Sequence, residues 1–161
     1  MKIKLFMWLV YHKKILTWDN IWKRGVLGTS RCQLYEAQEE TMEHLLNNCS
    51  FTSWLWGTFA SIFQQTDKDQ GSIINTLINW RHNFSDYEFL GTAHALTPGF
   101  IICNVWKERN KIILKNEKSP SQKLFEHILN QLKETVCTSV QNPPKNPPSD
   151  AELRILHQLG M

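Results

Sequence analysis

Apolar positions along this chain recur mainly at intervals of three and four residues, which is the spacing of amphipathic helices. Residues 50–63 and 73–83 show this spacing, and so does the stretch after Ser119-Pro120. Residues 3–16 are apolar on most sides, as in a helix that is buried in a core. No stretch alternates as a half-buried strand does. The pattern predicts a mostly α fold, a small helical domain with a short Cys/His turn near the N-terminal third.

Capping residues indicate where several of these helices begin and end. Thr17 can cap a short helix that Gly25 then ends. Thr97-Pro98 and Ser119-Pro120 each place a hydroxyl before a proline, which is a signal for the first turn of a helix. Glu39 and Glu40 suit the N-terminus of another helix. We therefore expect helices over residues 18–24, 41–47, 97–116 and 119–136.

The chain divides into three parts. Residues 1–63 contain the Cys/His turn, and residues 72–140 form a helical C-terminal region that we expect to pack on it. The sequence N-P-P-K-N-P-P opens the last part, residues 141–161. Paired prolines favour an extended, solvated chain. We therefore predict a Pro-rich linker and flexible tail there, with at most a detached helical turn or two over residues 151–160.

Composition adds little until the charges are placed along the chain. Hydrophobic residues make up 42% and charged residues 20%, and seven tryptophans argue against disorder. The net charge of +3 is mild, but the first 31 residues carry seven Lys and Arg side chains against the single acid Asp19. Five of these bases flank the Cys/His turn and are candidates for nucleic-acid binding, namely Lys13, Lys14, Lys23, Arg24 and Arg31. Basic runs of this kind are equally well explained as the solvated faces of helices.

The cysteines and the apolar runs indicate in which cellular compartment the protein is expected. Four widely spaced cysteines in a chain of 161 residues favour a reducing, intracellular setting over a disulfide framework. The apolar run near the N-terminus is too short for a membrane span, so no membrane partner is expected. Cys103 and Cys137 fall on apolar helix faces and are assigned to packing.

Cys32, His44 and Cys49 are spaced like the ligands of a small zinc site. Tyr35 stands where a C-x-x-C pair would place its second sulfur, and a phenol with a pKa near 10 is a poor ligand at neutral pH; Glu36 is the nearest substitute. On an ideal helix, residues five apart point about 140° apart, so His44 and Cys49 can share an ion only if the helix stops first, which Asn47-Asn48 would permit. In the alternative, the helix continues, Cys49 is a core thiol and His44 faces solvent.

Residues 2–56 resemble the zinc-binding segment of plant LINE-type retrotransposon reverse transcriptases, both in the text K-I-K-L-F-M-W-L-V-Y-H-K-K-I-L-T-W-D-N-I-W-K-R-G and in C-x-x-Y…E-E-T-M-E-H-L-L-N-N-C. The later V-W-K-E-R-N-K is similar to a stretch found downstream in such proteins. The resemblance implies Zn²⁺ held by Cys32, His44 and Cys49, a departure from the family at Tyr35, and nuclear residence. The polymerase carboxylates have no counterpart here, so a detached, non-catalytic fragment is expected.

Two functional hypotheses follow. The first is a retroelement-derived zinc-binding-like module that is not an enzyme and binds RNA or single-stranded DNA weakly through the five bases, with Trp18 or Trp22 stacking on unpaired bases. The second is a metal-free helical remnant or protein-interaction scaffold, for which an exposed aromatic patch around Trp54 and Trp56 would argue.

Overall fold

The computed structural model describes residues 2–28, 30–65, 71–80, 88–139 and 147–161. Within these ranges the chain is helical, with no strand beyond one isolated bridge between Arg31 and Glu39. The mostly α fold predicted from the sequence is therefore confirmed. The helices are α1 (Ile3–Tyr11), α2 (Trp18–Trp22), the π-helical turn η1 (His44–Asn48), α3 (Ser50–Ile62), α4 (Ile73–Trp80), α5 (Glu88–Lys115), α6 (Ser121–Ser139) and α7 (Asp150–Leu159).

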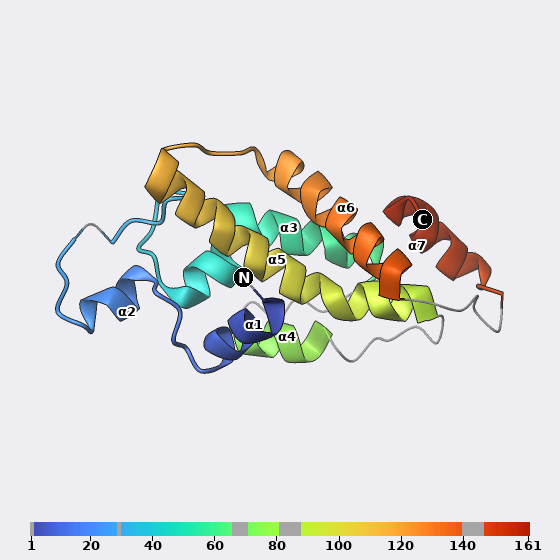
Figure 1. The fold of residues 1–161 in the computed structure, drawn as a ribbon, viewed down its shortest axis with the longest axis horizontal. Coiled ribbons are helices and arrows are strands. Elements are labelled where there is room, and N and C mark those ends of the chain that lie inside the picture. The colour runs from blue at the N-terminus through green and yellow to red at the C-terminus, as the bar shows by residue number, and fades with distance from the viewer. Residues whose placement is uncertain (1, 29, 66–70, 81–87, 140–146) are drawn as a thin grey trace.

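Helix α5 is the element around which the others pack. It contacts α1, α3, α4, α6, α7 and η1, and Figure 1 shows it running along the molecule with α6 beside it and α1 and α4 on its other side. Ile101, Ile102 and Val105 of α5 are fully buried. Each such side chain contributes about 1.5–3 kcal/mol through burial, so the core is centred on this helix.

The helix start expected at Thr97-Pro98 is wrong, because α5 begins at Glu88 and continues through Pro98. A proline inside a helix removes the N–H that would bond to the carbonyl four residues earlier, which here belongs to His94. The indole Nε1 of Trp80 donates to that carbonyl oxygen at 2.9 Å. Tertiary packing therefore supplies the hydrogen bond that the local sequence removes.

Helix α1 ends at Tyr11, earlier than the apolar pattern predicts. Lys13 adopts a left-handed conformation with φ of 54°. Its N–H donates to the Val10 carbonyl at 2.9 Å, and the Lys14 N–H donates to the Leu9 carbonyl at 2.8 Å. These two bonds are those of a Schellman motif, which satisfies the last carbonyls of a helix.

Helix α4 is anchored on the segment that carries the Cys/His turn. The Ile73 N–H at its start donates to Glu43 Oε2 at 2.6 Å, and Ser72 Oγ accepts from the Ile74 N–H at 3.2 Å and so caps the helix. The part of the expected helix that covers residues 81–83 lies outside the described residues.

The tail differs from its prediction where it is described. Residues 141–146 of the expected linker lie outside the described residues, but Asp150–Leu159 forms α7, which contacts α3 and α5. Ser149 and Glu152 form a capping box at its start, and Gly160 ends it with φ of 69°. Ile155 and Leu159 are buried. The apolar face of α7 therefore joins the core, so these residues are not a detached turn.

Candidate metal centre

The loop that carries Cys32 is closed by backbone pairing on both sides. The Cys32 N–H donates to the Gln38 carbonyl at 2.9 Å, and the Glu40 N–H donates to the Ser30 carbonyl at 2.5 Å. Arg31 and Glu39 form the bridge between these bonds. These paired segments form a small backbone clamp that turns Cys32 inward, and the Cys32 side chain is fully buried.

The turn that carries His44 is π-helical rather than α-helical. The Cys49 N–H donates to the His44 carbonyl at 2.6 Å, a bond that spans five residues. In an α-helix the residue four positions on lies above the first, whereas in this wider turn it is the residue five positions on. The π turn therefore brings Cys49 to the side of His44, which the α-helical spacing would not allow.

The helix stops before Cys49, as shared metal binding by His44 and Cys49 requires, because η1 ends at Asn48 and Cys49 has φ of −59° and ψ of 131°. The stop does not use a left-handed asparagine, since Asn47 and Asn48 are not among the residues with positive φ. His44 does not face solvent either, because its side chain is only 7% exposed.

Side chains of α3 take up the carbonyls that the π turn leaves without helical partners. Thr52 Oγ1 donates to the Leu45 carbonyl at 2.7 Å, and Trp56 Nε1 donates to the Leu46 carbonyl at 2.8 Å. Thr52 and Trp56 are themselves buried. Because these two carbonyls have hydrogen-bond partners, packing against α3 stabilises the π turn.

The structure brings Cys32, His44 and Cys49 together. One ligand atom from each lies within 4.8 Å of the others, and the two sulfurs are 3.9 Å apart. Two thiolates bound to one tetrahedral zinc at about 2.3 Å would lie about 3.8 Å apart. The spacing of the sulfurs therefore fits a zinc ion without rearrangement.

The imidazole of His44 gives a second test of fit. Both of its ring nitrogens are buried and have no hydrogen-bond partner. A buried polar atom without a partner costs roughly 1–3 kcal/mol, and native proteins rarely leave one unpaired. A metal ion bound by one ring nitrogen, in reach of the two sulfurs, would satisfy that nitrogen and remove its share of the cost.

The two thiols are electrostatically unequal. Their hydrogen bond, together with the backbone N–H groups of Tyr35 and Leu34, lowers the pKa of the Cys32 thiol to about 6 against the opposing effect of burial. The same hydrogen bond and burial raise the pKa of Cys49 above its usual range. The pair thus shares a proton in the metal-free state, and binding a zinc ion, which needs thiolates, would release it.

Among the described residues, no fourth protein ligand joins this cluster. Tyr35 is 49% exposed and Glu36 is exposed as well. In the part of the chain that the structure describes, Glu36 does not belong to the group around the three ligands, and neither does any other Asp, Glu, Cys or His. The remaining coordination position would be left to water or to an outside group.

Residues 1–56 match the family model for zinc-binding in reverse transcriptase. The match spans Cys32, His44 and Cys49 and ends inside α3, so it covers about a third of the chain. No curated protein and no solved structure matches this sequence. The zinc-binding match agrees with the chemistry of the buried Cys/His group, and it covers that group together with α1 and α2 but not the helices from α4 onward.

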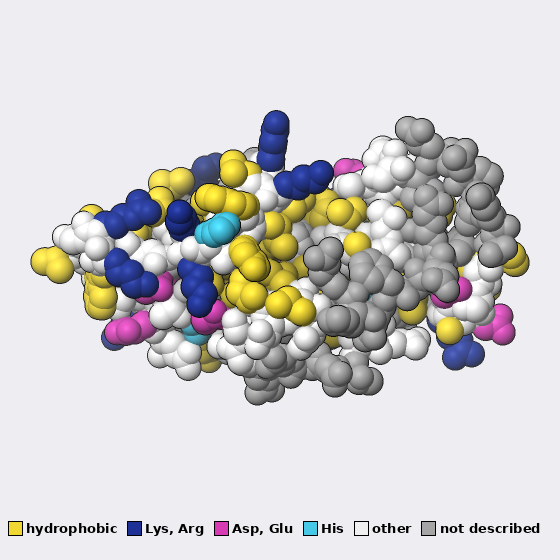
Figure 2. Space-filling view, turned by 90° about the horizontal axis from the view of Figure 1, so that it is seen from below, with side chains coloured by type: hydrophobic (Ala, Val, Ile, Leu, Met, Phe, Trp, Pro, Cys, Tyr) yellow, Lys and Arg dark blue, Asp and Glu magenta, His cyan; other side chains and the backbone are white. Residues whose placement is uncertain are grey.

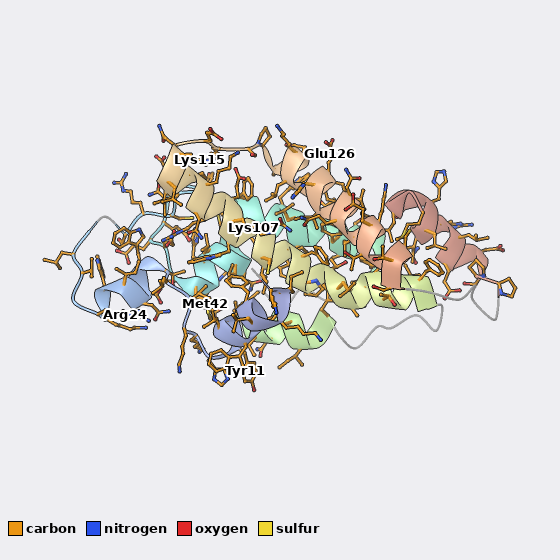
Figure 3. The ribbon with its side chains drawn as sticks, in the orientation of Figure 1. Tyr11, Arg24, Met42, Lys107, Lys115 and Glu126 are labelled. Carbon is orange, nitrogen blue, oxygen red and sulfur yellow. The ribbon has the colours of Figure 1, made fainter. Side chains whose placement is uncertain are left out.

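The five candidate bases lie outside the metal centre, and all are exposed. Figure 2 shows Lys and Arg side chains gathered over the end of the molecule that carries α2, and Figure 3 places Arg24 there. Lys23 Nζ is 3.9 Å from Asp19 Oδ2, and Lys14 Nζ lies 5.6 Å from the centre of the Trp8 ring.

None of the described helices is both long and apolar enough to cross a bilayer.

The remaining cysteines differ from each other. Cys103 of α5 is buried, as predicted, but Cys137 of α6 is exposed and the packing role expected for it is wrong. Both lie outside the metal centre, which leaves each available as a control in cysteine substitutions.

Proposed function

We propose that this chain is a retroelement-derived zinc-binding module that is not an enzyme, with Zn²⁺ held by Cys32, His44 and Cys49. The observation that carries the proposal is the buried cluster in which two sulfurs at zinc spacing face an imidazole without hydrogen-bond partners. The zinc-binding match over the same residues supports it. A zinc ion bound there would cross-link the Cys32 loop to the start of α3.

The direct test is the zinc-to-protein ratio of material purified without chelators. We expect a ratio near one for the native chain and a strong loss in His44→Ala and Cys49→Ser. Cys103→Ser is the matched control, because it also removes a buried thiol but lies outside the group. A native ratio near zero, or equal ratios in His44→Ala and Cys103→Ser, would contradict the proposal.

We further propose weak, sequence-tolerant binding to RNA or single-stranded DNA, and nuclear residence, by analogy with the elements that the N-terminal segment resembles. The exposed bases near α2 support phosphate contacts. For stacking, Trp8 and Tyr11 are better placed than Trp18, because they are 49% and 65% exposed while the Trp18 ring packs closely against Gly28. Trp22 is also exposed.

Salt dependence tests this second proposal. Each phosphate contact contributes about −0.7 to the slope of log affinity against log salt for single strands. We expect Lys13→Gln with Lys14→Gln to weaken binding to a mixed-sequence oligonucleotide and to reduce the slope by about 1.4. Arg154→Gln is the control, because Arg154 is an exposed side chain on α7, which lies at the opposite end of the molecule from α2 (Figure 1). A flat salt profile for the native chain would refute the proposal.

The alternative function is a metal-free interaction scaffold, and one observation favours it. An apolar groove of about 460 Å³ lies between α1, α4 and α5 and is lined by Met7, Tyr11, Leu77 and Ile78 among others. The expected patch around Trp54 and Trp56 is wrong in one member, since Trp56 is buried. Equal melting temperatures with zinc and with chelator, in protein that contains no zinc, would favour this alternative.

A further inference from the structure

The W-K-E-R-N stretch of α5 contains a buried charge that the proposed function does not use. Arg109 and Glu40 are 6% and 1% exposed, although they lie 69 positions apart in the sequence. Arg109 Nε is 3.2 and 3.0 Å from the two carboxylate oxygens of Glu40, and Arg109 Nη2 is 2.5 Å from Oε1. This is the two-pronged geometry that makes an Arg–carboxylate pair strong and directional.

Other contacts hold the pair in one orientation. The guanidinium lies 5.0 Å from the centre of the Trp106 ring, and its Nη2 donates to the Leu16 carbonyl at 3.5 Å. Glu40 Oε1 also accepts from the Trp18 N–H at 3.3 Å. The pair therefore ties α5 to the start of α2 as well as to the segment before η1.

Glu40 lies between the two arms that carry the metal ligands. On one side, its N–H closes the backbone clamp with Ser30 that turns Cys32 inward. On the other side, the adjacent Thr41 accepts the His44 N–H at its Oγ1, at 3.0 Å. A shift of Glu40 would therefore move both Cys32 and His44.

We propose that Arg109, acting through Glu40, is a positioning residue for the metal centre, so that zinc affinity depends on a residue of α5 outside the matched segment. This inference rests on the proposed zinc site. Groups that orient metal ligands from outside the coordination shell typically change metal affinity 10- to 100-fold. Residues 1–56 alone would then hold zinc less tightly than the full chain does.

The test compares zinc affinity, by competition with a chromogenic chelator, among full-length variants. We expect Arg109→Gln and Glu40→Gln each to weaken zinc binding about 10- to 100-fold. Lys111→Gln is the matched control, because Lys111 lies on the same helix and pairs with Glu117 at 3.7 Å and with Ser119 at 3.1 Å, neither of which belongs to the metal centre. Its zinc affinity should stay native.

A second readout separates positioning from general stabilisation. If the pair only stabilises the fold, Arg109→Lys lowers the melting temperature equally with zinc and with chelator. If it positions ligands, the loss is larger with zinc, and the thiolate-to-cobalt absorption of the Co²⁺-loaded protein shifts. The lysine keeps the buried positive charge but cannot make the two-pronged contact with Glu40. Because the carboxylate keeps a cation beside it, we expect this variant to fold.

Two outcomes overturn the inference separately from the proposed function. Native zinc affinity in Arg109→Gln, or equal melting losses with an unshifted cobalt spectrum in Arg109→Lys, would refute the positioning role while zinc binding stands. A native chain that binds neither zinc nor cobalt would refute the proposed function, and the positioning role with it.

Discussion

Replacing Tyr35 with cysteine should complete the metal centre. Tyr35 follows Cys32 by three residues, and its own N–H and that of Leu34 already lower the pKa of the Cys32 thiol. The turn is therefore folded around the first sulfur, while the phenol points out and is 49% exposed. A cysteine at this position has a short side chain in a turn that already faces the site.

The magnitude follows from the share of one ligand. Four-ligand zinc fingers gain about 10–16 kcal/mol of apparent free energy from the ion. An even share for each ligand is about 2.5–4 kcal/mol, or roughly a 100- to 1,000-fold increase in affinity. With zinc above the Kd of both proteins, the same free energy should raise the melting temperature by about 5–15 °C.

Competition titration and thermal unfolding measure the two effects on Tyr35→Cys. Tyr35→Ser is the control, because it shortens the same exposed side chain without adding a sulfur. We expect the serine variant to match the native chain in zinc affinity. A cysteine variant that binds zinc no more tightly than the serine variant would show that residue 35 does not face the ion, and the reasoning from the turn would fail.

Three further predictions concern stability. Trp80→Phe leaves the His94 carbonyl without its indole donor and should lower the free energy of unfolding by about 1–3 kcal/mol, measured in urea; an unchanged midpoint would contradict the account of Pro98. Burial lowers the pKa of His94 from 6.5 to about 4, so the unfolded chain binds more protons below pH 6.5. The free energy of unfolding of chelator-treated native protein should then fall by about 3 kcal/mol more than that of His94→Gln between pH 6.5 and 4. If the free energies of the two proteins fell in parallel with pH, this prediction would be wrong. Ser149→Ala removes the capping box of α7 and should cost about 1 kcal/mol, with faster amide exchange confined to that helix.

The sequence predicts the parts of this fold that local chemistry decides. The apolar spacing identifies the helix that begins at Ser50 and the one that begins at Ile73. Gly25, with φ of 80°, ends the turn after α2 as its position suggests. The ligand spacing identifies the three residues that the structure brings together. In each case the deciding groups lie within a few residues of one another.

Long-range contacts decide what the sequence does not predict. The partner of Glu40 lies on α5, and no local pattern marks Arg109 as that partner. The burial of His44 depends on a π turn. Because the sequence prediction for this segment assumes α-helical geometry, it does not include that turn. The exposure of Cys137 and the burial of Trp56 likewise depend on which helices pack beside them.

The two irregular backbone sites share one physical solution, which is an indole N–H that bonds to a backbone carbonyl left without a helical partner. At the π turn, the indole of Trp56 bonds to the Leu46 carbonyl; at Pro98, the indole of Trp80 bonds to the His94 carbonyl. The two rings also contact each other, with centres 5.4 Å apart. An indole is large enough to reach a backbone group across a packed interface and supplies a single N–H when it arrives. Because the π turn places His44 beside Cys49, the geometry of the metal centre depends on this aromatic packing as well as on its ligands.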